Sequence, residues 1–481
     1  MELLYILLIP LCTAGLSLLP FGRKWAAAVT ILGALAVFLL SARTAFFSPR
    51  GEEVVALPGW ISCDGLGALV LLLVAFVGLT AAIFSWEYIE KMVPSDRPRK
   101  IRRYYARYNL FLLSMLAVPA FSQVALVWIA VELTTLLSVF LVSFENTIEA
   151  LEAAWKYVVL TCLGAAFALL GILILYWGMD LSGKEPFTWT GLSRASAGIP
   201  PDLLKAAFLL ILVGFGTKAG LVPLHTWLPD AHSQAPSPVC ALLSGVETTA
   251  VLYVILRLLP VLQSAPSIQG ERWFLVAGLL STGIAAFLLI QAKDYKRLFA
   301  FSTVEHMGII MVAAGLGGPA AYYGAAFQML SHGVTKSFCF FAAGSTLLVT
   351  GSREMATVRG LVRMSPGAAM ALMAGGLAIA GAPPFAVFLS EFSILRAGLA
   401  NGQYLASGLL AVFIVIAFWG ILQPINRMVF GQPLEQSKKM GLPLTSGMAL
   451  VLAAIPVIFL GLYLPEPLHE LLRLAATALG R

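Results

Sequence analysis

The sequence predicts an all-α polytopic membrane protein, on three observations. Only 11% of the 481 residues are charged and 59% are hydrophobic, whereas soluble domains carry about 25% charged residues. Apolar stretches recur along the whole chain, each near the roughly 20 residues that a helix needs to cross a bilayer. Lone ionisable residues interrupt several of these stretches, as in helices that line ion paths. A soluble enzyme is therefore excluded.

We expect about 14 transmembrane helices. The first apolar stretch has no basic region before it and leads directly into further spans, so it is interpreted as a helix and not as a signal peptide. Residues 105–144 are long enough for two spans. The expected spans lie at about 2–20, 25–47, 65–90, 105–122, 123–144, 155–178, 203–222, 236–258, 271–291, 297–316, 320–350, 368–392, 404–430 and 443–464.

The loop charges predict the orientation in the membrane. An even number of spans places both termini on one side. Most of the 31 Lys and Arg residues fall in loops on the other side, and the cluster Lys91–Arg107 dominates this asymmetry. Because cytoplasmic loops carry the excess of basic residues, both termini are expected at the outer face of the plasma membrane. The cluster itself is interpreted as a topology determinant in lipid contact.

Two halves of the chain repeat the same order of features. WIAVELTTLL (128–137) and FSTVEHMGII (301–310) both place Val–Glu early in a span. The second span after each is interrupted by Gly and Pro, in GFGTKAGLVPLHTW (214–227) and GLAIAGAPPFAVFLSEF (376–392). The starts are an odd number of spans apart, so the halves would be inverted five-helix repeats, each with a discontinuous helix, as in transporters.

This organisation divides the chain into four parts. They are an N-terminal three-helix segment (1–104), a first inverted repeat (105–258) broken near 220–232, a second repeat (271–430) broken near 381–385, and a C-terminal helix with a short tail (431–481).

Lys218 is the centre of the predicted site. It lies in an apolar helix that breaks at Gly220 and Pro223. A lysine at the bilayer centre costs roughly 2.5–3.5 kcal/mol even on lenient scales, and a broken helix is tolerated there only where protein or a water-filled cavity satisfies its backbone. These features predict an ion site. The polar tract after the break adds the candidates His225, Asp230 and His232.

Glu132, two spans earlier, is the expected partner of Lys218. A carboxylate and an ammonium in low dielectric stabilise each other's charged forms, so such a pair can act as a proton switch. The alternative is a static ion pair that locks two helices together. The helix between Glu132 and Lys218 carries Lys156, and its counterpart in the second half carries Lys336.

Further ionisable residues could continue a proton path. His332 and Lys336 are four residues apart and share one helical face, and histidine passes protons in either direction near neutral pH. Glu305 and Glu391 occupy repeat-related positions. Glu247, beside two threonines, is either a member of the path or the acceptor of a structural hydrogen bond.

No cofactor is expected in this chain. The five cysteines are scattered, and none has the spacing of a metal, disulfide or iron–sulfur site. Any redox chemistry is expected in another subunit.

Longer motifs match a known family. They are KRLFAFSTVEHMG (296–308), PLHTWLPDA (223–231), GAPPFAVFLSEF (381–392) and the pair His332 and Lys336. The chain resembles the antiporter-like proton-translocating subunits shared by respiratory complex I, Mrp-type cation/proton antiporters and membrane-bound energy-converting hydrogenases. SFENTIEALEAAWKYVVL and SPVCALLSG resemble most closely the F-type component of hydrogenase-4 and of formate-hydrogenlyase-like complexes.

The resemblance implies roles for individual residues. Glu132 would pair with Lys218, Lys156 would modulate the pair, and Glu391 would end the second half. His332 and Lys336 would connect the halves. The family often has a lysine or histidine on the helix after the first break, where this chain offers Glu247.

The resemblance also implies partners. These are other membrane subunits and a peripheral redox arm that holds iron–sulfur clusters and a nickel–iron site or a flavin. The expected function is therefore a non-redox subunit that moves protons, coupled to electron transfer elsewhere in an oxidoreductase complex. The alternatives are an Mrp-like sodium/proton antiporter subunit, an inert scaffold, or a subunit of a bicarbonate-uptake system.

Overall fold

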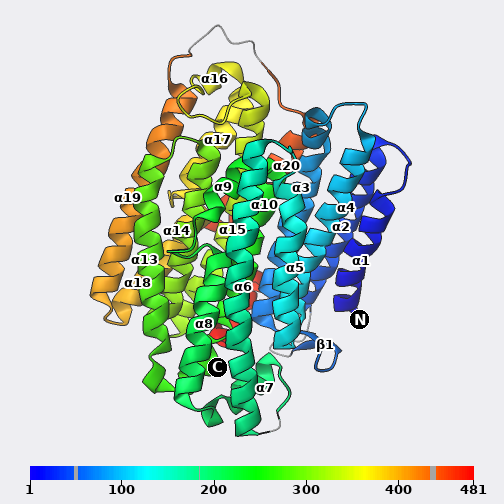
Figure 1. Ribbon diagram of the computed structural model, residues 1–481. Coiled ribbons are helices and arrows are strands. Elements are labelled where there is room, and N and C mark those ends of the chain that lie inside the picture. Colours follow the sequence, from blue (N-terminus) through cyan, green and yellow to red (C-terminus); the bar gives the residue numbers. More distant parts are fainter. Residues whose placement is uncertain (48–52, 184, 434–439, 481) are drawn as a thin grey trace.

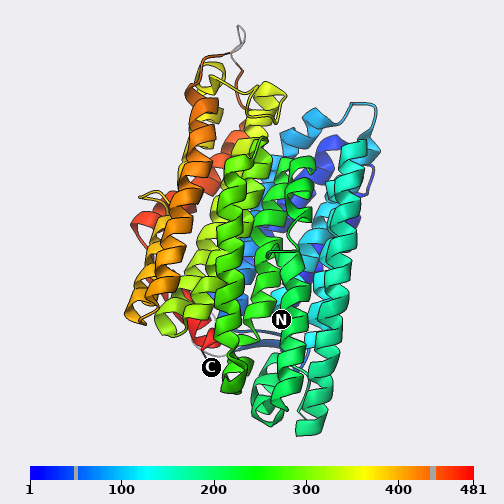
Figure 2. The same cartoon turned by 60° about the vertical axis from the view of Figure 1, so that its left-hand side comes forward.

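The computed structural model describes residues 1–47, 53–183, 185–433 and 440–480. Long helices run side by side along one direction, and both termini lie toward the same end of the bundle (Figures 1 and 2). In the described part, ten helices are long and apolar enough to cross a membrane. The predicted helical membrane protein is confirmed.

The helices follow one another with short connections. The first half contains α1 (Glu2–Ser17), α2 (Arg23–Phe47), α3 (Gly65–Met92), α4 (Pro98–Ala120), α5 (Val124–Val142), α6 (Ile148–Ser182), α7 (Trp189–Ala195), α8 (Pro201–Ala219), α9 (Trp227–Gln234), α10 (Ser237–Leu242), η2 (Leu243–Glu247), α11 (Thr248–Leu256) and α12 (Leu259–Gln263). The second contains α13 (Gly270–Gln291), α14 (Tyr295–Leu316), α15 (Pro319–Thr350), α16 (Leu361–Met364), α17 (Pro366–Ile379), α18 (Ala386–Ala400), α19 (Tyr404–Phe430), α20 (Leu444–Leu462) and α21 (Glu466–Leu479). Two single 3-10 turns, η1 (Ser196–Gly198) and η3 (Pro266–Ile268), lie in connections.

Both predicted helix breaks are present. Gly220 ends α8 with φ +81°, a conformation that favours glycine, and the helix resumes at Trp227. The break is therefore shorter than 220–232. The second break, between α17 and α18, contains Gly381 with φ +74° and agrees with the expected 381–385.

Some elements differ from expectation. α4 begins at Pro98, so part of the basic cluster is helical, and α6 runs over 35 residues to Ser182. β1 (Val54–Leu57) and β2 (Ile61–Cys63) form an antiparallel hairpin before α3. The expected tail contains an amphipathic helix, α21, which packs against α3 and α15 and in which all leucines except Leu474 are buried. Residues 48–52 of the expected N-terminal part, and 434–439 and 481 of the expected last part, lie outside the described ranges.

The centre of the bundle is formed by α3, α10–α11, α14 and α15, whose residues are almost all buried. Helices α2, α19 and α20 lie at the periphery and expose apolar side chains. In a membrane protein such exposed faces contact lipid or other subunits. The central helices and η2 carry Glu247, Glu305, His306, His332 and Lys336, which places these residues in the protein interior.

Candidate functional site

The backbone around the first helix break is satisfied by protein groups. The amide of Leu221 donates to the Gly216 carbonyl at 2.8 Å, and Trp227 Nε1 donates to the Thr217 carbonyl at 2.8 Å. The amide of Val222 donates to Ser281 Oγ at 3.1 Å. These bonds explain how a helix can end inside the bundle.

Lys218 lies in the last turn of α8 and is buried. The negative end of a helix dipole stabilises a cation at this position. Its Nζ donates to the Val131 carbonyl and to Thr135 Oγ1, both from α5. Lys218 therefore bridges the broken helix and α5.

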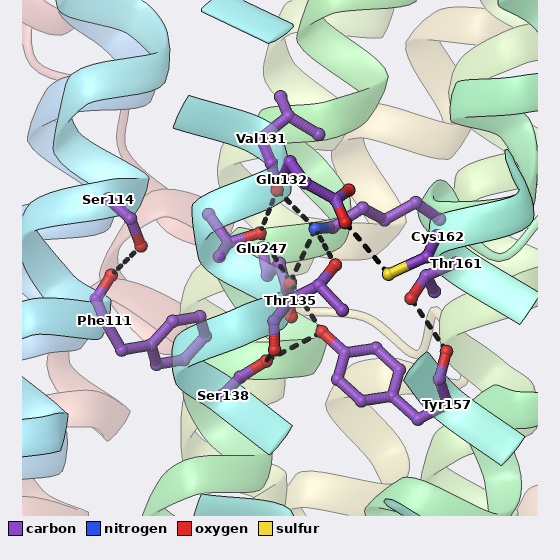
Figure 3. Close-up of polar contacts among 12 residues, drawn as sticks. Phe111, Ser114, Val131, Glu132, Thr135, Ser138, Tyr157, Thr161, Cys162 and Glu247 are labelled. Carbon is purple, nitrogen blue, oxygen red and sulfur yellow. Dashed lines mark hydrogen bonds and ion pairs between the residues drawn. The ribbon is translucent and has the colours of Figure 1, made fainter. Parts of the chain in front are cut away.

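Glu247 supplies the carboxylate of this site. Its Oε1 lies 3.5 Å from Lys218 Nζ and accepts hydrogen bonds from Thr134 Oγ1 at 2.8 Å and Tyr157 OH at 2.9 Å. Figure 3 shows Glu247 among side chains from α5 and α6. Glu247 ends a π-helical turn, η2, a feature that is often found at functional sites. Its Oε2 has no partner among the described residues.

The expected pair of Glu132 and Lys218 is corrected by the structure. Glu132 is only partly buried, and its Oε1 accepts a hydrogen bond from Cys162 Sγ at 2.9 Å (Figure 3). In the described part of the chain, the ion pair of Lys218 is with Glu247.

Lys156 also lies elsewhere than expected. It is 42% exposed, and its Nζ pairs with Glu152 at 2.6 Å and with Asp230 at 3.3 Å. Asp230 pairs with Arg297 as well. These residues form a surface cluster that joins α6, α9 and α14. The neighbour of Lys156, Tyr157, is the residue of α6 that reaches Glu247.

His225, within the break, and His232, after it, make few polar contacts. His232 is buried, and its Nδ1 bonds the Leu228 carbonyl within α9 at 2.7 Å. His225 is nearly buried, and its Nδ1 has no partner among the described residues. Neither histidine is hydrogen-bonded to Lys218 or Glu247 in this part of the chain.

Lys336 forms a second buried lysine site, on α15. Its Nζ donates to the Phe299 carbonyl at 2.6 Å and to Ser302 Oγ, both from α14. The arrangement is similar to that of Lys218, which donates to one carbonyl and one hydroxyl of α5. Glu305, one turn after Ser302, is buried with its Oε2 unpaired among the described residues.

A histidine network lies beside Lys336. The ring centroids of His306 and His332 are 5.2 Å apart. His306 Nδ1 bonds Gln328 Nε2 at 2.7 Å and lies 3.9 Å from Glu391 Oε1. Ser390 donates to Gln328 at 2.5 Å. The structure thus brings Glu391, beside the second break, to His306, which in turn lies beside His332.

The π-helical turn connects the two halves by direct packing. A Cβ built on Gly245 would lie 3.0 Å from the Gly333 carbonyl oxygen, and one on Gly333 would lie 2.8 Å from the Gly245 oxygen. Ser244 contacts both α14 and α15, because its Oγ bonds Thr303 Oγ1 at 2.6 Å and its carbonyl bonds His332 Nε2 at 3.2 Å. The glycines therefore allow η2 and α15 to cross in contact.

Several of these contacts involve residues that the sequence did not single out. Threonine and serine are common in apolar helices, where they bond their own backbone, so their participation cannot be inferred from sequence. Tyr157 could have been found from helix geometry, because it and not Lys156 shares a face with the buried side of α6. The residues missed include Thr134, Thr135, Tyr157, Cys162, Ser244, Ser302, Thr303, Gln328 and Ser390.

Comparison with known proteins decides the family. The family described as NADH:quinone oxidoreductase/Mrp antiporter, transmembrane, matches residues 122–417. The chain belongs to this family. Its match to a hydrogenase-4 component F homolog from Methylacidiphilum infernorum is 36% identical and covers 85% of this chain and 86% of that protein. NADH-quinone oxidoreductase subunit N from Desulforudis audaxviator is 27% identical over 95% of this chain and 93% of that protein.

Solved structures of related complexes contain chains with the same fold. A chain of an archaeal membrane-bound sulfane sulfur reductase superimposes with a TM-score of 0.89 at 24% identity, covering 99% of this chain and 97% of that one. A chain of the Mrp complex from a Dietzia species gives 0.86 at 22% identity and the same coverage. A chain of Thermus thermophilus respiratory complex I gives 0.83 at 23% identity, covering 100% of both. The chain is thus an antiporter-like membrane subunit related to those of hydrogenases and complex I.

In the described part of the chain, no group of three or more His, Cys, Asp or Glu side chains is arranged to hold a metal ion. The buried lysines at the centre are instead bonded to hydroxyls, backbone carbonyls and, for Lys218, a carboxylate.

Proposed function

We propose that the chain translocates protons as a subunit of an energy-converting hydrogenase or a complex I-related oxidoreductase, driven by electron transfer in partner subunits. The observation that carries the proposal is the buried ion pair of Lys218 and Glu247 beside a helix break. An isolated charge at this depth is costly, so the pair's stability depends on the position and protonation of both groups. That dependence is what a proton switch requires.

The contacts of Lys218 define how the switch would work. While Glu247 is ionised and close, the lysine ammonium is stabilised. If Glu247 moves away or is protonated, the ammonium loses its counter-ion in a medium of low dielectric and releases its proton. A shift of the break after Gly220 would change the distance between the two groups, since Lys218 is only two residues from the break.

The proton path would continue through the second lysine site. Lys336 and His332 share one face of α15, His306 of α14 lies beside His332, and Glu391 of α18 lies beside His306. Several atoms along this path, including Glu247 Oε2, Glu305 Oε2 and His332 Nδ1, have no protein partner in the described chain. Buried polar atoms are normally satisfied, and water molecules would both satisfy these atoms and carry protons between them.

The remaining organisation is proposed from the repeat pattern. The chain would form 14 transmembrane helices, with inverted repeats at 105–258 and 271–430, an N-terminal segment at 1–104 and a C-terminal part at 431–481. The similar donor geometry of Lys218 and Lys336 supports two related halves. Glu132, partly exposed on α5, would receive the protons that enter the first half. Asp230 and Lys156 would form a polar surface near the helix break of that half.

The partners are proposed from the relatives. Other membrane subunits would flank this chain in the plasma membrane, with both termini at the outer face. Iron–sulfur clusters and a nickel–iron site or a flavin would be held by the subunits of a peripheral arm.

The test is proton uptake into vesicles that contain the purified complex, measured together with its redox turnover. Lys218→Ala should abolish uptake while assembly is retained. Lys205→Ala is a matched control, since Lys205 is an exposed lysine on the same helix. Unchanged uptake by Lys218→Ala would refute the switch.

Sodium/proton exchange is the second candidate, because the Mrp complex chain shares the fold. Sodium flux into the same vesicles separates the two functions. Sodium movement that requires Lys218 would favour the antiporter. If the vesicles take up protons at the full rate and no sodium moves, the redox-coupled pump would be favoured.

A further inference from the structure

A strongly basic hollow lies where α4 begins and α5 ends, at the end of the bundle that carries α16 in Figure 1. Its volume is about 960 Å³. Two carboxylates, Asp96 and Glu145, also line it. We call it the basic groove, and its cations are Arg97, Arg99, Lys100, Arg102, Arg103 and Arg107.

The cations of the groove are not neutralised by the chain. None of the six makes an ion pair with another described residue. Lys100 Nζ lies 4.5 Å from the centre of the Phe144 ring, and the Arg107 guanidinium lies 4.8 Å from that of Phe140. These contacts hold the two side chains in place without cancelling their charge. Like charges gathered in this way repel, and a bound anion would remove the repulsion.

An apolar stripe begins directly at the groove. Phe140 lines the groove and is 50% exposed. Leu136, Leu133 and Ile129 follow it along α5, each more than 40% exposed. Their spacing places all four on one face of the helix. The surface therefore offers cations at the membrane boundary and a continuous apolar track below them.

We propose that the basic groove binds the phosphate headgroup of an anionic phospholipid, with an acyl chain along the stripe of α5. Arginine forms paired hydrogen bonds with phosphate oxygens, and basic groups at the membrane surface attract anionic lipids. A free phosphate would use the cations but not the stripe. An acidic protein segment would have no need of an apolar track that runs down the membrane-spanning part of α5. The cluster at Lys91–Arg107 is then a specific site as well as a topology determinant.

The test is lipid retention by the purified complex, followed by native mass spectrometry and by its thermal unfolding midpoint. After exchange into neutral detergent, phosphatidylglycerol, phosphatidylethanolamine or glycerol phosphate is added. Phosphatidylglycerol should bind and raise the midpoint, and the other two should not. The double variant Arg99→Gln with Arg103→Gln should bind it at least ~10-fold more weakly, since it removes two of the surface cations that attract an anionic lipid.

A matched control removes the same charge at the same end of the bundle. Arg359→Gln with Arg363→Gln changes two exposed arginines near α16 and should leave lipid binding unchanged. Equal binding of both phospholipids, or equal loss in both double variants, would overturn the proposal. Glycerol phosphate binding as tightly as the lipid would show a phosphate site only and overturn the role of the stripe. A crosslink from position 99 to an acidic partner subunit, without retained lipid, would show a protein interface and also overturn it.

Discussion

Glu247 Oε1 lies 3.5 Å from Lys218 Nζ, and each side chain is only 1% exposed. The pair joins the end of α8 to the π-helical turn that crosses α15. Removing one partner of such a pair leaves an uncompensated buried charge, at a cost of about 3–5 kcal/mol. In the proposed switch, the Lys218 ammonium would avoid this cost by releasing its proton when Glu247 is protonated or moves away.

Glu247→Gln should therefore reduce proton uptake at least ~10-fold while the complex assembles, because Lys218 loses its buried counter-ion. The amide oxygen of Gln can still accept from Thr134 and Tyr157, so lost packing would not account for the effect. The measurement is vesicle proton uptake per redox turnover. Glu271→Gln is the control, because Glu271 bonds Tyr322 outside the Lys218 site. Equal losses in both variants would contradict a specific role for Glu247.

Tyr157→Phe should lower the unfolding midpoint and proton uptake more than removal of the neighbouring side chain in Lys156→Ala does. The change removes the hydroxyl that donates to Glu247 at 2.9 Å, and a buried hydrogen bond to a charged group contributes about 1.5–3 kcal/mol. Lys156→Ala breaks only exposed ion pairs, which contribute about 0–1 kcal/mol. Unfolding midpoints and proton uptake of the two variants make the comparison. A larger loss of uptake in Lys156→Ala would support the modulating role that the family resemblance assigns to this lysine.

Cys162→Ala should change how Glu132 receives protons. Cys162 Sγ donates the hydrogen bond of Glu132 at 2.9 Å, so the carboxylate would be free to turn. We expect the pH dependence of uptake to move while the maximal rate changes little. Cys162→Ser, which keeps a donor, should restore the wild-type profile. Identical profiles for the alanine, serine and wild-type proteins would rule out this positioning role.

Gly333→Ala should destabilise the crossing of the two halves. The new Cβ would meet the Gly245 backbone oxygen at 2.8 Å, and overpacking of this kind costs about 1–3 kcal/mol. Gly408→Ala is the control, since its Cβ would meet nothing within 4 Å. Thermal unfolding of the purified complex distinguishes them. An unchanged midpoint for Gly333→Ala would show that η2 and α15 can separate without cost.

The stability of the N-terminal part should depend on pH through Asp64, which precedes α3. Burial alone would raise the pKa of Asp64, but the Arg257 guanidinium, with hydrogen bonds at 2.5 Å, holds this pKa below its ordinary value. A lowered pKa in the folded state gives stability that is present above the ordinary value and lost as pH falls toward the lowered one. Asp64→Asn can still cap α3 but carries no charge. The difference in unfolding midpoint between wild type and Asp64→Asn should therefore shrink as the pH falls below the ordinary aspartate pKa of about 3.8.

Several features of the chain could be predicted because they depend on neighbouring residues only. Hydropathy indicated the helical membrane protein, and the Gly and Pro residues near Gly220 and Gly381 indicated both breaks. Long local motifs indicated the family. The buried positions of Lys218, Lys336 and Glu391 agree with their place in apolar helices, because each helix is recognised from its own residues.

The partner of Lys218 depends on the packing of helices that are distant in the chain. Glu132 and Glu247 both lie in apolar helices, and the choice between them depends on how each helix is rotated about its axis. The π-helical turn at Leu243–Glu247 adds to this rotation, since it takes more residues per turn than an α-helix. Helix geometry separates Tyr157 from Lys156, because only Tyr157 shares the buried side of α6, but its contact with Glu247 depends on the packing. Local sequence was enough to predict a helical membrane protein and the apolar helices that carry these residues, whereas the packing of the rotated helices decided which of the residues meet.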